Sequence, residues 1–307
     1  MTDRSLRRFR ETVLPGIHRL SLPYRNVSVN VYVVVGDGAR LVDTGDGSPE
    51  AARQLHWHLA DLGIQVRDLR EILLTHTHPD HVGMAEELAA DSGARVLVHE
   101  AEAEAAAVGS GSVVDFDWLE EHGLSPAARD HFRPGWRTPP GAEALRDGDL
   151  LQFGPLRLEI LATPGHSPGL VCAYDRSRGL VFSSDQLMRV PSPITLLDRR
   201  DGDPIGRYLQ SLGRLAPLEV STALPGHGRT LPDWGLALAR AAEFHVRRAD
   251  VVERRWAAGG TSVKELAAEL EPAIDRAGPV GVEVLEIGRV LAVIRHLEHR
   301  AAGRVGI

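Results

Sequence analysis

The sequence predicts an α/β fold in which two layers of β-sheet carry helices on their outer faces, followed by a small domain built of helices. Three observations lead to this prediction. Apolar, β-branched segments alternate with helical segments in the first half of the chain. A second series of apolar segments follows, and from about residue 235 onward only helical patterns remain. Strands this apolar are covered on both faces, which two sheets with outer helices provide.

The strands are expected where short apolar runs end at turn residues. These runs are residues 27–36, 39–45, 71–75, 94–99, 156–163, 170–175, 179–185 and 220–224. Helices are expected at residues 48–63, 83–93 and about 205–215. The first helix has clear end signals, because Ser48 can cap its start, Pro49 suits its first position and Gly63 follows its end.

Two segments depart from this alternation. Residues 100–145 contain helical pieces separated by glycine, serine and proline, and we expect a helical insertion there. Residues 235–307 contain three helical patterns, the second of which opens with a capping box of Ser262 and Glu265. The predicted organisation is therefore a domain of residues 1–234 that carries the insertion, followed by a helical domain of residues 235–307.

Composition narrows the class of protein. The chain has 307 residues, of which 43% are hydrophobic and 25% charged, as is usual for a globular protein with a substantial core. A net charge of −7 argues against a general attraction to nucleic acid or to anionic membranes. The lone cysteine, Cys172, excludes a disulfide within the chain. Because no apolar segment has the pattern of a secretory signal or a membrane span, we expect a cytoplasmic protein.

The segment "HTHPDH" crowds three histidines and an aspartate into six positions after a predicted strand. In an extended segment His76 and His78 point to the same side and can offer two imidazoles to one metal ion. Pro79 suits the start of a helix, so Asp80 and His81 fall in the following turn, where they can face a second metal ion. A chance cluster of surface histidines is the alternative, but the spacing directly after a buried strand favours a metal site.

Three further candidates follow other predicted strands. His166 lies in "TPGHSPG", Asp185 in "FSSDQ" and His227 in "LPGHG". Loops at the ends of strands often carry functional residues, and glycines there let the backbone turn tightly enough to aim a side chain inward. Aspartate and histidine are also common turn residues, so each position alone has a purely structural explanation. The repeated placement after strands favours one shared metal site.

These motifs, together with "LVDTG" upstream, resemble those of the metallo-β-lactamase-fold hydrolase superfamily. The resemblance covers about residues 15–232 in order and spacing. It implies a four-layer αβ/βα sandwich with a metal site at one edge, between the two sheets. The helical tail resembles the small winged-helix-like domain of the lactamase-beta-like and glyoxalase II-like branch of that superfamily.

The resemblance also implies which residues bind metal. It assigns His76, His78 and His166 to a first metal ion and Asp80, His81 and His227 to a second, with Asp185 bridging both and Asp43 of "LVDTG" orienting a ligand without binding metal. Imidazole and carboxylate ligands without a thiolate favour two zinc ions, with iron or manganese as alternatives. Two such ions about 3.5–4 Å apart can hold a bridging hydroxide and lower the pKa of water towards ~7. Asp80 is the candidate catalytic residue, since it can also handle the proton.

The predicted function is a dinuclear metal-dependent hydrolase that uses this bridging hydroxide on a small-molecule ester, thioester or lactone. Trp118, Phe132 and Trp136 in the insertion are candidates for an apolar wall of the substrate pocket, although packing of the insertion onto the core explains them equally well.

Two alternatives from other classes remain. The first is a metal-dependent endoribonuclease, because the branch that the tail resembles includes one. Basic and acidic residues are nearly equal in number over residues 236–307, however, so the tail fits packing or a homodimer better than nucleic acid. The second is a non-catalytic binding module, which the presence of all seven implied ligands argues against.

Overall fold

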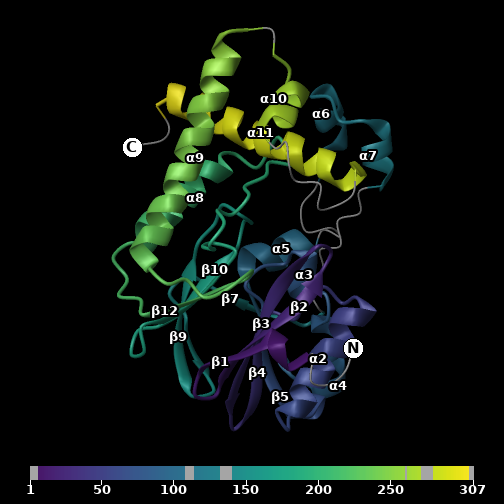
Figure 1. The fold of residues 1–307 in the computed structure, drawn as a ribbon, viewed down its shortest axis with the longest axis vertical. Coiled ribbons are helices and arrows are strands. Elements are labelled where there is room, and N and C mark those ends of the chain that lie inside the picture. Colours follow the sequence, from purple (N-terminus) through teal and green to yellow (C-terminus); the bar gives the residue numbers. More distant parts are fainter. Residues whose placement is uncertain (1–5, 108–113, 132–139, 260, 271–278, 304–307) are drawn as a thin grey trace.

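The computed structural model describes residues 6–107, 114–131, 140–259, 261–270 and 279–303. Within these residues the strands form one sheet of seven strands and one of five. Figure 1 shows both sheets in the lower part of the molecule and the C-terminal helices above them. The two sheets carry the apolar runs that the sequence analysis identified as strands.

The first sheet has an antiparallel half and a parallel half. In spatial order its strands are β1 (Arg10–Leu14), β2 (Ile17–Tyr24), β3 (Val27–Gly36), β4 (Gly38–Val42), β5 (Leu69–Leu73), β6 (Arg95–His99) and β7 (Glu143–Leu145). Neighbours from β1 to β4 are antiparallel, and neighbours from β4 to β7 are parallel. The carboxyl ends of β4 and β5 therefore meet at the same edge of the sheet.

The second sheet, on the other side of the core, also contains both parallel and antiparallel pairs. In spatial order its strands are β12 (Thr222–Pro225), β11 (Leu180–Ser184), β10 (Val171–Asp175), β9 (Leu156–Ala162) and β8 (Leu150–Phe153). The pair β11 and β12 is parallel, whereas the other neighbours are antiparallel. The carboxyl ends of β11 and β12 are thus brought together as well.

Some helices cover the outer faces of the two sheets, and others pack beside one another above the sheets. The helices are α2 (Pro49–Asp61), α3 (Pro79–Val82), α4 (Ala85–Ser92), α5 (Glu100–Ala107), α6 (Phe116–Glu121), α7 (Pro126–His131), α8 (Pro204–Leu215), α9 (Trp234–Ala257), α10 (Val263–Leu270) and α11 (Pro279–Ala301), with 3-10 turns at Arg7–Phe9 and Val66–Asp68. Apolar side chains of α2 and α4 pack on the first sheet, and those of α8, α9 and α11 join the apolar cluster of the second.

The central core lies between the two sheets. Tyr32 of β3 and Phe182 of β11 meet there edge to face, with ring centroids 5.4 Å apart. Val34 and Val42 from the first sheet and Ile160 from the second belong to the same buried cluster. Helix, sheet, sheet and helix thus form four layers, which confirms the predicted αβ/βα sandwich with a helical C-terminal region.

Several boundaries differ from the predicted ones, each for a local reason. β1 and β2 lie ahead of the first predicted strand. They were not predicted because most of their residues are partly buried or exposed, and their sequences lack a continuous apolar run. β7 falls at the end of the predicted helical insertion and pairs with β6, but three residues are too few to show a period. The strand predicted at residues 39–45 ends at Val42, because Asp43 has a positive φ of 60°.

The helices of the insertion pack beside the C-terminal helices (Figure 1). Trp118 of α6 is only 8% exposed and belongs to the apolar cluster that α6 shares with α9, α10 and α11. This burial fits packing of the insertion, one of the two roles expected from the sequence, and the pocket-wall role stays a prediction. Phe132 and Trp136 lie outside the described residues. Among the described helices, we find no stretch long and apolar enough to span a membrane.

Candidate metal centre

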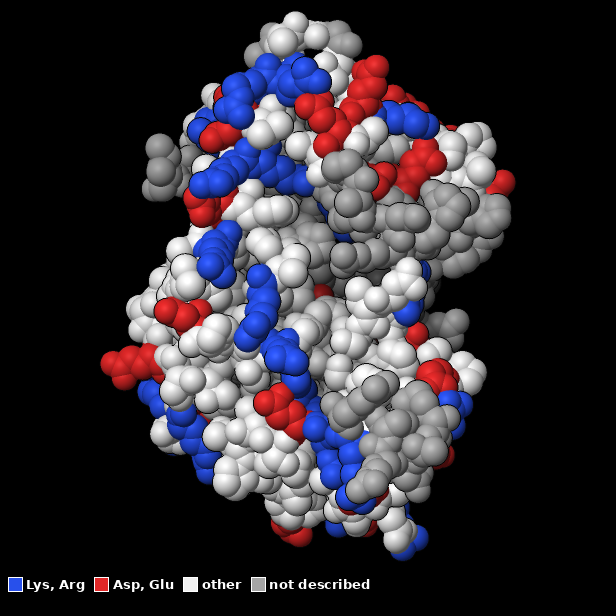
Figure 2. All heavy atoms as spheres, in the orientation of Figure 1, with Lys and Arg blue, Asp and Glu red and all other residues white. Residues whose placement is uncertain are grey.

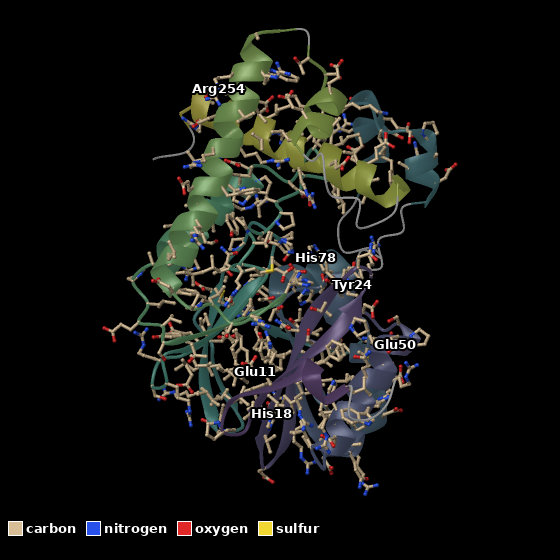
Figure 3. The ribbon with its side chains drawn as sticks, in the orientation of Figure 1. Glu11, His18, Tyr24, Glu50, His78 and Arg254 are labelled. Atoms are coloured by element: carbon tan, nitrogen blue, oxygen red, sulfur yellow. The ribbon has the colours of Figure 1, made fainter. Side chains whose placement is uncertain are left out.

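Every predicted ligand lies just beyond the carboxyl end of a strand, at one edge of the sandwich. Asp43 follows β4, and the segment with His76, His78, Asp80 and His81 follows β5. In the second sheet the ligands His166, Asp185 and His227 follow β9, β11 and β12. Figure 3 shows His78 where the strands of the two sheets meet. The parallel pairs in each sheet thus bring distant segments of the chain to one place.

The "HTHPDH" segment changes direction after His78. Residues 74–78 belong to neither a strand nor a helix, His78 has an extended backbone, and Pro79 then occupies the first position of the short helix α3. His76 and His78 project from this connecting segment, whereas Asp80 and His81 project from the helix. His76 and His81 are fully buried, and Asp80 is 7% exposed. One segment of six residues therefore supplies donors from two directions.

The first group of donors is formed by His76, His78 and His166, as predicted. Their ligand atoms all lie within 4.8 Å of one another. The Nε2 atom of His166 is 2.9 Å from the Nδ1 atom of His78. His78 thus faces the site through Nδ1, whereas His166 faces it through Nε2.

The second group of donors is formed by Asp80, His81 and His227, again within 4.8 Å of one another. The Nε2 atom of His227 lies 3.2 Å from Oδ2 of Asp80, and the Nε2 atom of His81 lies 3.7 Å from the same oxygen. Asp80 therefore stands between two imidazoles.

Asp185 lies between the two groups. Its Oδ2 atom is 3.5 Å from Nε2 of His166 and 3.4 Å from Nε2 of His227. Its Oδ1 atom is 3.7 Å from Nε2 of His81. A third set of donors, His76, His81 and Asp185, also falls within 4.8 Å. One carboxylate is therefore shared by the whole cluster, which is the position that a bridging ligand needs.

The outer nitrogens of the imidazoles are held by hydrogen bonds. Nδ1 of His166 donates to the carbonyl oxygen of Pro193 at 3.0 Å, and Nδ1 of His227 donates to the carbonyl oxygen of Ser28 at 2.7 Å. Nδ1 of His81 donates to Oδ2 of Asp43 at 2.8 Å. Each of these bonds places a proton on the outer nitrogen, so that in the neutral imidazole the Nε2 lone pair faces inward, as a metal ligand requires.

Asp43 supports the site without facing it. Its carboxylate accepts hydrogen bonds from the backbone N–H of Thr75 at 2.8 Å and from the Thr75 hydroxyl, as well as from His81. Asp43 and Ser184 both have positive φ, of 60° and 46°, and the Ser184 hydroxyl lies 2.6 Å from that of Thr75. Strained backbone at the ends of two strands indicates that these positions are fixed by the needs of the site.

Three histidines of the cluster are held neutral. Burial, followed by the neighbouring imidazoles, lowers the pKa of His76 well below its ordinary value. Burial also lowers the pKa of His78 to about 4 and, together with the adjacent His78, that of His166 to about 4. Neutral imidazoles are the form that binds a metal ion, so this half of the site is ready to do so at neutral pH.

The other half of the cluster attracts positive charge. Burial lowers the pKa of His227, but Asp185 and Asp80 outweigh it and raise that pKa to about 10. Burial likewise lowers the pKa of His81. The charges of Asp43, Asp185 and Asp80 outweigh burial, and this pKa rises well above its ordinary value. Carboxylates that attract protons this strongly attract a divalent cation in the same place.

The fit to metal ions can be judged from atoms that have no other partner. Among the described side chains, Nε2 of His76, Nε2 of His81 and Oδ1 of Asp185 are buried without a hydrogen bond. Buried polar atoms are normally paired, so three orphaned atoms in one cluster call for an explanation. The three residues form one of the groups whose candidate ligand atoms lie within 4.8 Å of one another. The donor set of imidazoles and carboxylates therefore fits divalent metal ions.

Sequence reasoning missed residues that support the cluster. Glu102 of α5 is 2% exposed and accepts hydrogen bonds from both ligand-bearing loops. Ser192 places its hydroxyl 2.9 Å from Nδ1 of His166. Tyr24 ends β2 close enough that burial, Asp80 and other charges raise its pKa to about 12. These side chains belong to no local motif, so only the tertiary structure reveals them.

Cys172 is excluded as a nucleophile by its surroundings. Its side chain is fully buried in β10, and burial raises the pKa of the thiol to about 12. The reactive form of cysteine is the thiolate, which this environment disfavours. The chemistry of this edge therefore rests on the histidine and aspartate cluster.

Comparison with known proteins gives the same picture. An acyl-coenzyme A thioesterase of Homo sapiens, MBLAC2, is 30% identical over 246 residues, which cover 73% of this chain and 81% of that protein. A probable metallo-hydrolase of Bacillus subtilis (strain 168), YqjP, is 25% identical over 275 residues, which cover 83% of this chain and 84% of that protein. The crystal structure of a metallo-beta-lactamase family protein from Thermus thermophilus, TTHA1429, superposes with a TM-score of 0.79 and 29% identity, over 95% of this chain and 96% of that one.

The family match covers the part of the chain that builds the site. Residues 24–227 match the family described as the Metallo-beta-lactamase superfamily, and this range runs from the end of β2 to the last predicted ligand. Together with the relatives named as hydrolases, it identifies a metal-dependent hydrolase. The chain belongs to the metallo-β-lactamase superfamily.

Proposed function

We propose that this protein is a dinuclear metal-dependent hydrolase that cleaves a small-molecule thioester. In this proposal the His76, His78 and His166 group holds one metal ion and the Asp80, His81 and His227 group holds the other, with Asp185 bridging them. Asp43 orients His81 without binding metal. Zinc is the favoured metal, with iron or manganese as alternatives, because the donors are imidazoles and carboxylates without a thiolate.

One observation carries the proposal: two separate groups of three donors share a single carboxylate. Asp185 lies within 3.7 Å of one imidazole in the first group and of two in the second. A single metal ion would leave one of the groups, with its buried and unpaired atoms, unexplained. Two adjacent ions account for both groups and for the orphaned atoms of His76 and His81.

The protein's own groups prepare the site for hydrolysis. When bound, the two metal ions would lower the pKa of water and stabilise the negative charge that develops on the substrate oxygen. Burial raises the pKa of Asp80, but His81 and His227 outweigh it, so Asp80 is ionised and can accept a proton at neutral pH. The hydrogen bonds from His166 and His227 to backbone carbonyls keep both imidazoles aimed at the site.

The choice of a thioester rests on the relatives. The human relative is named as an acyl-coenzyme A thioesterase and covers most of the present chain. An ester or a lactone presents the same acyl carbon to the site, so either is the nearest alternative to a thioester. Acyl-coenzyme A compounds of short and long chain are the first substrates to test.

Charge argues against nucleic acid as the substrate. Figure 2 shows a band of basic side chains that runs from α9 towards the strands, with acidic side chains beside it at several points. The net charge of the whole chain is −7. Phosphate-backbone binding depends on a strong surplus of positive charge, which this balance does not supply. We therefore propose a small molecule as the partner, and a cytoplasmic location remains part of the proposal.

The proposal is tested by metal content and by turnover. We expect two metal ions per chain and hydrolysis of at least one acyl-coenzyme A. Asp80→Ala and His166→Ala should abolish turnover while circular dichroism shows an intact fold. His18→Ala is the matched control, because His18 lies on β2 away from His78 (Figure 3).

Three outcomes would contradict the proposal. A folded protein that binds no metal would exclude the dinuclear site. Unchanged turnover in either site variant would exclude that residue from its role. Cleavage of single-stranded RNA without any acyl hydrolysis would replace the thioester by a phosphodiester, and RNA should therefore be assayed beside the acyl substrates.

A further inference from the structure

Glu102 is a buried carboxylate beside the metal centre that the proposed function leaves without a role. It lies in the first turn of α5, directly after β6, and its side chain is 2% exposed. Burying a carboxylate is costly unless hydrogen bonds compensate it. The hydrogen-bond partners of Glu102 therefore indicate why a carboxylate is placed there.

Each oxygen of Glu102 serves a different loop. Oε2 accepts hydrogen bonds from the backbone N–H of Thr77 at 3.1 Å and from the Thr77 hydroxyl at 2.5 Å. Oε1 accepts hydrogen bonds from the Ser167 hydroxyl at 2.5 Å and from the backbone N–H of Gly169 at 2.8 Å. Four donors converge on one carboxylate, two from each loop, and a carboxylate has the acceptor capacity for all of them.

The two loops carry three of the predicted ligands. Thr77 stands between His76 and His78, and Ser167 directly follows His166. The ligand atoms of His78 and His166 lie 2.9 Å apart across the gap between the loops. A group that ties Thr77 to Ser167 thus fixes the distance between the two halves of the first donor group.

Close packing shows that α5 is pressed against the His166 loop. A Cβ atom at Gly169 would lie 2.8 Å from Cγ of Glu102, 2.8 Å from its backbone nitrogen and 3.0 Å from Nδ1 of His99. Such distances exclude a side chain at this position without a shift of backbone. The loop can therefore approach Glu102 this closely because residue 169 is a glycine.

We propose that Glu102 is a positioning residue that sets the geometry of the metal site formed by His76, His78 and His166. It acts through the backbone and hydroxyl groups next to these ligands and does not touch the metal. This inference rests on the proposed function only in taking these histidines as ligands, and it is independent of the substrate.

The test replaces Glu102 by glutamine. In Glu102→Gln one oxygen becomes an NH₂ group, which cannot accept a hydrogen bond and faces the donors of one loop. We expect affinity for one of the two metal ions to fall by about 10- to 100-fold, as happens when groups that support a ligand are lost. Metal affinity is measured by competition with a chelator, and the visible absorption of the cobalt-substituted protein reports the ligand geometry directly.

Glu71→Gln is the matched control. Glu71 is also a buried carboxylate, 6% exposed, but it lies in the middle of β5 and pairs with Arg40 and Arg95. We expect Glu71→Gln to lower the melting temperature while leaving the metal affinity and the cobalt spectrum unchanged. Loss of metal affinity in Glu102→Gln alone therefore separates positioning from general stability.

The inference is overturned if Glu102→Gln has wild-type metal affinity and a wild-type cobalt spectrum. Should that variant fail to fold, Ser167→Ala and Thr77→Val each remove one hydroxyl bond to Glu102 and keep the carboxylate. Unchanged metal affinity in both would equally overturn it. A wild-type protein that binds two metal ions but hydrolyses no acyl substrate would refute the proposed function and leave this inference standing.

Discussion

Replacing Gly226 by alanine tests the position of the shared carboxylate. Gly226 lies between β12 and His227, and a Cβ atom there would be 2.1 Å from Oδ1 of Asp185 and 2.9 Å from Cε1 of His81. An ordinary contact between carbon and oxygen is about 3.4 Å. The Asp185 oxygen or the loop must therefore move by roughly 1.3 Å, the difference between these distances.

The loop is poorly placed to move. The Gly226 carbonyl oxygen accepts a hydrogen bond from the backbone N–H of Asn30 at 2.7 Å. The neighbouring Pro225 carbonyl accepts hydrogen bonds from the side chains of Asn30 and Tyr32, at 2.8 and 2.7 Å. Because this loop is fixed to β3, we expect the Asp185 carboxylate to be displaced. A misplacement of about 1 Å can lower a rate by about 10²-fold, equivalent to about 2.7 kcal/mol.

The assay compares kcat/KM on the best acyl substrate, together with metal content, for Gly226→Ala and Gly213→Ala. Gly213 lies exposed in α8, and a Cβ atom there meets nothing within 4 Å. We expect Gly213→Ala to retain full activity and to gain up to about 1 kcal/mol of stability, since alanine favours a helix. If Gly226→Ala kept two metal ions and activity within twofold of wild type, Asp185 would not be the shared ligand.

Three further predictions concern the same cluster. Removing metal with a chelator should lower the melting temperature, because buried carboxylates and imidazoles would lose their bound cations; calorimetry with and without added zinc measures this. Asp43→Asn should keep the backbone conformation, since asparagine tolerates positive φ. It should weaken metal binding by about 10- to 100-fold, because the charge that faces His81 is lost. Competition with a chelator measures this affinity. Affinity for the metal held by His81 and His227 should rise by at least tenfold per pH unit from pH 6 to 9. In the metal-free protein the pKa of His227 is about 10 and that of His81 lies well above its ordinary value, so binding must displace a proton from each. Affinity at the His78 and His166 side should stay nearly constant, and equal slopes at both sites would contradict this.

The grouping of the candidate ligands could be predicted from the sequence because their positions follow a local rule. Each follows an apolar strand, and a loop at a strand end presents its side chains at the edge of the sheet. An extended stretch before Pro79 is predicted to place His76 and His78 on one side by a period of two. The structure brings all seven together, and its orphaned buried atoms agree with a metal-binding role.

The supporting residues could not be predicted, because their partners are distant in the chain. Glu102 bonds to residues 25 and 65 positions away, and nothing in "EAEAEAAA" distinguishes it from its neighbours Glu100 and Glu104. β1 and β2 were missed for a related reason. Their burial depends on what covers each face, which the sequence pattern of residues 10–24 shows only weakly.

The C-terminal helices support the candidate site by holding the loop that follows Asp185. Nε2 of His245 in α9 lies 3.1 Å from the carbonyl oxygen of Ser192, whose hydroxyl lies 2.9 Å from Nδ1 of His166. In α11, the carbonyl oxygen of Gly288 accepts a hydrogen bond from the backbone N–H of Leu196 at 2.9 Å. Two helices far along the chain thus hold the segment that orients a predicted ligand. The helical region is therefore connected to the candidate metal centre through the hydrogen bonds of Ser192.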